Sequence, residues 1–128
     1  MIYLDTSVAL AQLVAEDRCP PDSLWDEPLI SSRLLQYEVW NRIHGRKLIK
    51  SHGPSARSLL GRVAFIELAP PVLERALDPF GVPVRTLDAL HLASLLFLVE
   101  RGVQIELASY DKALVGAAKR LGVSVIKL

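Results

Sequence analysis

Four acidic residues lie at positions where their carboxylates could act together. Asp5 directly follows a short apolar run, and Asp111 follows a second apolar run that ends near Ser109. Glu38 lies in the middle of an expected helix, and Asp88 lies in the first turn of the most apolar helix of the chain. Because unpaired carboxylates are costly to bury, four of them near apolar faces and strand ends indicate one shared site.

Converging carboxylates repel one another, and no lysine or arginine neighbours all four of these acids in the sequence. A divalent metal ion would compensate their charge. Oxygen ligands alone favour Mg²⁺ or Mn²⁺, whereas the absence of a Cys/His cluster from the sequence argues against zinc. Carboxylate-held magnesium is typical of phosphoryl chemistry, in which one ion activates a water and another can stabilise the leaving oxygen. The four acids therefore predict a metal site of this kind.

Each of the four acids also has a purely structural interpretation. Asp5 and Asp111 could each cap the helix that follows it. Glu38 precedes Arg42 by four residues, which suits an ion pair on one exposed helix face. Asp88, in a first helical turn, suits the helix dipole. The sequence leaves both interpretations open for every one of these residues.

The other residues that could ligate or react are interpreted as structural. The single cysteine, Cys19, excludes an internal disulfide and a cysteine-based zinc cluster. His91 lies three residues after Asp88 and is interpreted as a packed or hydrogen-bonded histidine. The remaining acids lie at helix ends or in polar loops and are expected on the surface: Glu16, Asp17, Asp22, Asp26, Glu27, Glu74, Asp78 and Glu100.

Basic residues are concentrated in one part of a nearly neutral chain. The formal net charge is +1, yet residues 39–66 contain no acidic residue. The basic residues of this segment are Arg42, Arg46, Lys47, Lys50, Arg57 and Arg62. Such a block could contact a polyanion or form a solvated helix face, and the spacing does not separate the two.

Strand-like and helix-like segments that alternate along the chain would position these side chains. Strands are expected at 2–4, 28–31, 65–68, 103–109 and 123–126. Helices are expected at 6–14, 32–47, 55–63, from 70 to the loop at 78–83, 86–99 and 111–121, with a turn at 52–54. This alternation predicts an α/β fold with a mostly parallel sheet of about four to five strands. Sites in such sheets form beyond the carboxyl ends of the strands, where Asp5 and Asp111 stand.

The length and composition favour a single globular domain over residues 1–128. The chain is 51% hydrophobic and 23% charged, which suits a folded core. The apolar stretch from Ala89 to Val99 is too short to span a bilayer, and Met1 leads into Ile2 without a basic segment typical of a signal peptide. We therefore expect a cytoplasmic protein without a membrane segment.

Four parts of the sequence together resemble a known family. They are MIYLDTS at 1–7, Glu38 within a helix, RTLDALHLA at 85–93 and SYD at 109–111. In order and spacing they resemble the PIN-domain family, and within it the VapC-type toxins of toxin–antitoxin pairs. The resemblance implies a PIN-like α/β/α sandwich and an endoribonuclease that depends on Mg²⁺ or Mn²⁺. It also implies a homodimer and a small antitoxin that inserts a segment into the active groove.

The resemblance also implies roles for individual residues. The acidic cluster would be Asp5, Glu38, Asp88 and Asp111, with Thr6 or Ser7 and Ser109 orienting water or metal. Asp5 and Asp88 would hold the metal most directly, Glu38 would bind through water or act as a base, and Asp111 would complete the site from further out. Separately from the resemblance, the basic block leads us to expect that Arg42, Arg46 and Lys47, which follow Glu38, hold the phosphate backbone of an RNA substrate without reading its sequence.

Two alternatives remain at this point. One is a non-catalytic PIN-like module that binds RNA or protein. The other is a haloacid-dehalogenase-like phosphatase, which also begins with an aspartate after the first strand. That family needs a second aspartate two residues later, where this chain has Ser7.

Overall fold

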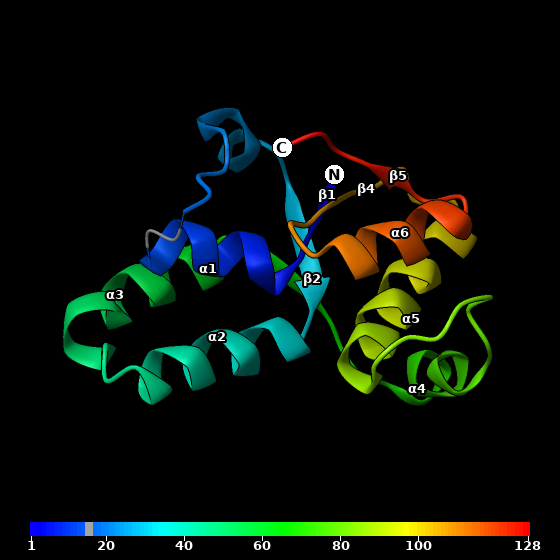
Figure 1. The fold of residues 1–128 in the computed structure, drawn as a ribbon, viewed down its shortest axis with the longest axis horizontal. Helices are drawn as coiled ribbons and strands as arrows, with labels where there is room; N and C mark the ends of the chain where they lie inside the picture. The colour runs from blue at the N-terminus through cyan, green and yellow to red at the C-terminus, as the bar shows by residue number, and fades with distance from the viewer. Residues whose placement is uncertain (15–16) are drawn as a thin grey trace.

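The computed structural model describes residues 1–14 and 17–128, and these residues form a layered α/β structure (Figure 1). The described strands are β1 (Ile2–Leu4), β2 (Leu29–Ser32), β3 (Val63–Ile66), β4 (Glu106–Ala108) and β5 (Ser124–Val125). They form one five-stranded sheet in the order β3-β2-β1-β4-β5, and every neighbouring pair is parallel. The expected parallel α/β sheet is confirmed.

Helices cover both faces of the sheet. They are α1 (Thr6–Val14), α2 (Leu34–Gly45), α3 (Ile49–Leu60), α4 (Pro70–Leu77), α5 (Thr86–Glu100) and α6 (Lys112–Arg120), with a short 3₁₀ helix at Asp22–Asp26. Side chains alternate across a strand, so Ile2 and Leu4 of β1 pack with α1–α3, whereas Tyr3 packs with the helices of the other face. Figure 1 shows α1–α3 on one side of the sheet and α4–α6 on the other. The expected α/β/α sandwich is therefore confirmed.

The strand register brings the two predicted strand-end positions together. In β1, Leu4 pairs with Ala108 of β4, and the backbone N–H of Asp5 donates to the Ala108 carbonyl at 3.0 Å. Both strands end at this pair, so the chain segments that follow them begin side by side. Asp5 and Ser109 consequently lie at the same edge of the sheet.

The most apolar helix is central, as its sequence predicts. Seven residues of α5 are buried, including Leu92, Leu95 and the polar residues His91 and Ser94. A helix that is apolar on nearly all sides needs cover from several elements, and α5 packs against α4, α6 and β2. No helix of the described ranges is long and apolar enough to cross a membrane.

The expected turn at 52–54 is wrong, because these residues lie inside α3. Pro54 removes only one intrahelical hydrogen bond, and the helix compensates by burying one face against α1 and α2. Gly53, Ala56 and Leu60 belong to that buried face. Tertiary packing thus overrides the local preference of a Gly-Pro pair.

Smaller differences concern strand ends and surface acids. Strand β3 begins at Val63, two residues before the expected start, because it pairs residue by residue with β2. Strand β4 covers only the last part of the expected 103–109 segment. The other acids expected on the surface are exposed, except that Glu16 lies outside the described residues.

Candidate active site

Asp5 lies at the centre of a polar cluster at the carboxyl end of β1. Its side chain is only 6% exposed. The Oδ2 atom accepts hydrogen bonds from Ser7 Oγ at 2.5 Å, from Ser109 Oγ at 2.8 Å and from the Ser7 backbone N–H at 3.3 Å. Within the described residues no hydrogen bond reaches Oδ1. One carboxylate oxygen is therefore fixed, and the other is left for a ligand.

The two serines are themselves oriented by the backbone. Ser7 Oγ accepts from the backbone N–H of Tyr110 at 2.9 Å, and Ser109 Oγ accepts from that of Asp111 at 2.9 Å. Each hydroxyl thus accepts one backbone hydrogen bond and donates its own proton to Asp5. The predicted polar residues Ser7 and Ser109 therefore orient Asp5. The Ser7 N–H contact shows that Asp5 also caps α1.

Glu38 reaches the same edge of the sheet from α2. Its Oε1 atom accepts from Thr6 Oγ1 at 2.7 Å and lies 2.6 Å from His91 Nε2. Burial alone would raise the pKa of Glu38, but the hydrogen bond and charge of His91, together with the Thr6 hydrogen bond, lower it below its usual value. Glu38 is therefore ionised, and its partners come from other elements of the fold.

His91 is buried and hydrogen-bonded, which confirms its interpretation. It is 2% exposed, and its Nδ1 lies 2.9 Å from the hydroxyl of Tyr3, which is fully buried. The Tyr3 oxygen also accepts from the backbone N–H of Ser32 at 3.2 Å. No pattern in the sequence had connected Tyr3 and His91 with Glu38. Their positions two residues before Asp5 and three after Asp88 were the available signal.

Asp88 is half-buried in the first turn of α5, as expected. Burial raises its pKa, and the charges of Asp111, Asp5 and Glu38 raise it further, against a smaller opposing effect of His91. Within the described part of the chain its side chain accepts no hydrogen bond. The structure thus brings the four predicted acids into one group whose negative charges interact.

Asp111 has the structural role considered for it. It is the N-cap of α6, and its Oδ1 accepts from the backbone N–H groups of Ala113 at 2.9 Å and Leu114 at 3.2 Å. The cap uses only one carboxylate oxygen, so Asp111 can cap α6 and still face the acidic group.

The predicted basic residues differ in their relation to this site. Arg42, Arg46 and Lys47 are all exposed at the end of α2 or just beyond it. Arg46 lines a cavity of about 510 Å³ together with Ser7, whose hydroxyl donates to Asp5, but none of the four predicted acids lines this cavity. Arg18 lines the same cavity, donates to the Tyr110 carbonyl at 2.9 Å and stacks over the Tyr110 ring. Arg18 was not among the predicted residues, because it is an isolated arginine in an acidic segment of the sequence.

The side chains fit a hard divalent cation by their chemistry. As the side chains stand, no three Asp, Glu, His or Cys residues of the described ranges are close enough together to hold a metal ion. The group nevertheless offers carboxylate oxygens that take no hydrogen bond from these residues, in Asp5 and Asp88. Burial raises the pKa of Asp88 and the neighbouring acids raise it further, and a cation would relieve the repulsion among these acids. His91 does not compete as a ligand, because Tyr3 and Glu38 occupy both of its ring nitrogens.

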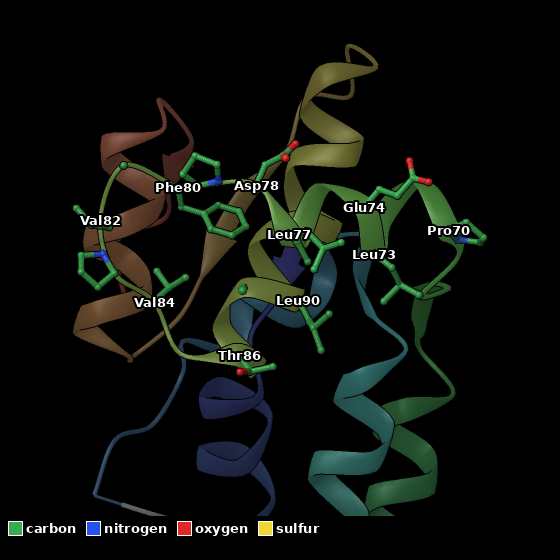
Figure 2. A pocket seen from close by; sticks show the side chains of 15 residues that line it. Pro70, Leu73, Glu74, Leu77, Asp78, Phe80, Val82, Val84, Thr86 and Leu90 are labelled. Atoms are coloured by element: carbon green, nitrogen blue, oxygen red, sulfur yellow. The ribbon is translucent and has the colours of Figure 1, made fainter.

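A larger cavity on the α4–α6 face has a different character. It measures about 1080 Å³ and lies between α4, the loop at 78–85 and the start of α5. Figure 2 shows Leu77, Leu90, Phe80 and Val84 around it, with Glu74 and Asp78 as its labelled acidic residues. None of the four predicted site acids lines it. Its lining is mainly apolar, so the candidate active site is the acidic group at the strand ends.

One comparison with known proteins gives a relative over nearly the full chain. Ribonuclease VapC46 of Mycobacterium tuberculosis is 32% identical to this chain over 131 residues, which cover 98% of this chain and 95% of the relative. No protein-family model matches the sequence.

Proposed function

The chain belongs to the VapC family of ribonucleases, and from this premise we propose that it is a Mg²⁺- or Mn²⁺-dependent endoribonuclease of the PIN type and the toxin of a type II toxin–antitoxin pair. One observation carries the proposal. The ends of β1 and β4 place Asp5, with one oxygen fixed by Ser7 and Ser109, among three further acids whose charges interact. That arrangement is suited to holding a divalent cation beside a phosphodiester.

The acids take different parts in the proposed hydrolysis. Asp5 and Asp88 would hold the metal through their carboxylate oxygens, and Asp111 would add negative charge from the start of α6. When bound, the metal would supply a Lewis acid for a phosphoryl oxygen and lower the pKa of water. Glu38, ionised and fixed at Oε1, would accept a proton from the attacking water or hold that water in place. The water oxygen attacks phosphorus, and the P–O bond to the leaving group breaks.

Partners follow from the same proposal. Family membership supports a small cognate antitoxin that inserts a segment into the active groove. We also propose a homodimer and a cytoplasmic location. The remaining alternative is a non-catalytic binding module, and an RNA-cleavage assay distinguishes it from an endoribonuclease. The phosphatase alternative has no support from the relative or from the site.

Purified protein should cleave single-stranded or looped RNA when Mg²⁺ or Mn²⁺ is present and stop when EDTA removes the metal. The reason is that a cation at the acidic group would activate water and offset the repulsion between the carboxylates and the scissile phosphate. The measurement is gel analysis of 5′-labelled RNA, with DNA of the same sequence as the substrate control. Undiminished cleavage in EDTA would contradict metal dependence. Binding of RNA without cleavage under any metal condition would favour the non-catalytic module.

The basic residues should contribute a salt-dependent part of RNA affinity. If Arg42 and Arg46 each contact a phosphate, replacing both with alanine should make the log–log salt slope of binding shallower by roughly 1.4, about 0.7 for each contact with single-stranded RNA. Fluorescence anisotropy of labelled RNA in EDTA measures the slope. Arg101 and Arg120, exposed near the ends of α5 and α6, provide a control pair of equal charge. If replacing both Arg42 and Arg46 leaves the salt slope unchanged, these residues form a solvated helix face and do not contact the RNA.

A further inference from the structure

We propose that His91 is a positioning residue that orients Glu38 for the RNA-hydrolysing site and that Tyr3 in turn orients His91, an inference that rests on the proposed function. The residues form a continuous hydrogen-bonded chain. The Ser32 backbone N–H contacts the Tyr3 hydroxyl at 3.2 Å, that hydroxyl contacts His91 Nδ1 at 2.9 Å, and His91 Nε2 contacts Glu38 Oε1 at 2.6 Å.

The chemistry of each group determines which atom donates and which accepts in this series of hydrogen bonds. The Ser32 N–H can only donate, so the Tyr3 oxygen accepts from it. The Tyr3 hydroxyl has one proton of its own and can donate it to His91 Nδ1. The Glu38 carboxylate can only accept, so Nε2 of His91 carries a hydrogen. A hydrogen on Nε2 therefore joins His91 to Glu38, and the Tyr3 hydroxyl lies against the opposite ring nitrogen.

The chain fixes one oxygen of Glu38 and leaves the other for the site. Oε1 is held from two sides, by His91 of α5 and by Thr6 at the start of α1. No hydrogen bond from the described residues reaches Oε2. Tyr3 and His91 are almost fully buried, and leaving either without a partner would be costly, so the chain cannot rearrange cheaply. The second oxygen of Glu38 is thereby held in one place.

Helix α5 links two of the acids through this chain. Asp88 and His91 are three residues apart and therefore lie on the same helix face. The helix presents Asp88 itself and also holds Glu38, which belongs to α2. A histidine needed only for packing could bond to a backbone carbonyl, whereas His91 bonds to an acid of the site. The position of His91 thus determines where Glu38 lies relative to Asp88.

Two replacements of His91 separate positioning from packing. His91→Leu removes the donor, and His91→Gln keeps an amide N–H that can reach Glu38. We expect the single-turnover cleavage rate at saturating protein to fall about 10- to 100-fold in His91→Leu and much less in His91→Gln. RNA affinity in EDTA should not change in either variant. Leu95→Val, at a buried apolar position of α5, is the control: it should lower the melting temperature and leave the rate unchanged.

A double-mutant cycle and a spectroscopic measurement complete the test. If His91 acts through Glu38, His91→Leu should cause no further loss of rate in a Glu38→Gln background. Nitrogen NMR of the metal-free parent should show a hydrogen on Nε2 of His91. Should His91→Leu fail to fold, Tyr3→Phe provides the second variant and should also slow cleavage, to a smaller extent.

The outcomes distinguish this inference from the proposed function. A parent protein that cleaves no RNA under any metal condition overturns the proposed function and this role with it. If the parent cleaves RNA but no faster than the His91→Leu and Tyr3→Phe variants, the positioning role alone is overturned. The same loss of rate from His91→Leu in the Glu38→Gln background as in the parent, or a His91 ring without a hydrogen on Nε2, overturns it as well.

Discussion

Asp5→Asn should lower the rate of RNA cleavage by at least about 100-fold, the scale of losing one preorganised electrostatic contact, and should leave the fold intact. The asparagine carbonyl can take the place of Oδ2 and accept from Ser7 and Ser109. Its amide nitrogen then stands where Oδ1 stood, and an amide N–H cannot ligate a cation. The substitution thus removes the proposed ligand and keeps the hydrogen bonds that orient it.

Asp88→Asn should have an effect of similar size for the same reason, because its carboxylate is the other proposed direct ligand. The control is Asp26→Asn, an exposed aspartate of the 3₁₀ helix that is distant in the sequence from every site acid. Single-turnover rates with Mn²⁺ and circular dichroism of all three variants are the measurements. Full activity in either Asp5→Asn or Asp88→Asn would show that these acids do not form the catalytic site.

Local sequence patterns were sufficient to predict the parallel sheet and the edge of the sheet at which Asp5 and Asp111 lie. Ile2–Leu4 is a short apolar run closed by an acid, which is typical of a buried parallel strand with a polar residue at its carboxyl end. The apolar residues all around Thr86–Glu100 likewise required a central position for that helix. In both cases the burial of a contiguous segment is determined by its own residue types, so no knowledge of distant contacts was needed.

Contacts between distant segments could not be predicted in the same way. Glu38 and His91 are 53 residues apart, and their contact depends on how α2 and α5 cross the end of the sheet. The pattern around Glu38 offered Arg42 as a partner, because a local rule only compares residues on one helix face. Pro54 gives a similar lesson: the local preference indicates a turn, whereas burial of the Gly53 face against α1 and α2 stabilises a helix. Only the assembled fold contains this information.

The metal-free protein should become more stable when Asp88 is replaced with asparagine, although most substitutions destabilise. The pKa of Asp88 is raised above its ordinary value of 3.8 by burial and by Asp111, Asp5 and Glu38. A raised carboxyl pKa means that the folded state disfavours the charged form, so ionised Asp88 costs stability at neutral pH. After allowance for solvent and salt screening of a partly exposed group, we expect a gain of about 1 kcal/mol, or roughly 4 °C in melting temperature.

The dependence on pH and metal gives this prediction its sharpest test. The cost is fully present above the raised pKa and disappears as the pH falls through it, so the difference between parent and Asp88→Asn should shrink from pH 7 toward pH 4. Mn²⁺ should stabilise the parent by about 2.7 kcal/mol at 100 times its Kd and the variant much less. Thermal unfolding in EDTA and in millimolar Mn²⁺ measures both effects, with Asp26→Asn as the control. An aspartate that served only its helix dipole would behave in the opposite way: Asp88→Asn would melt lower in EDTA, and metal would change neither protein.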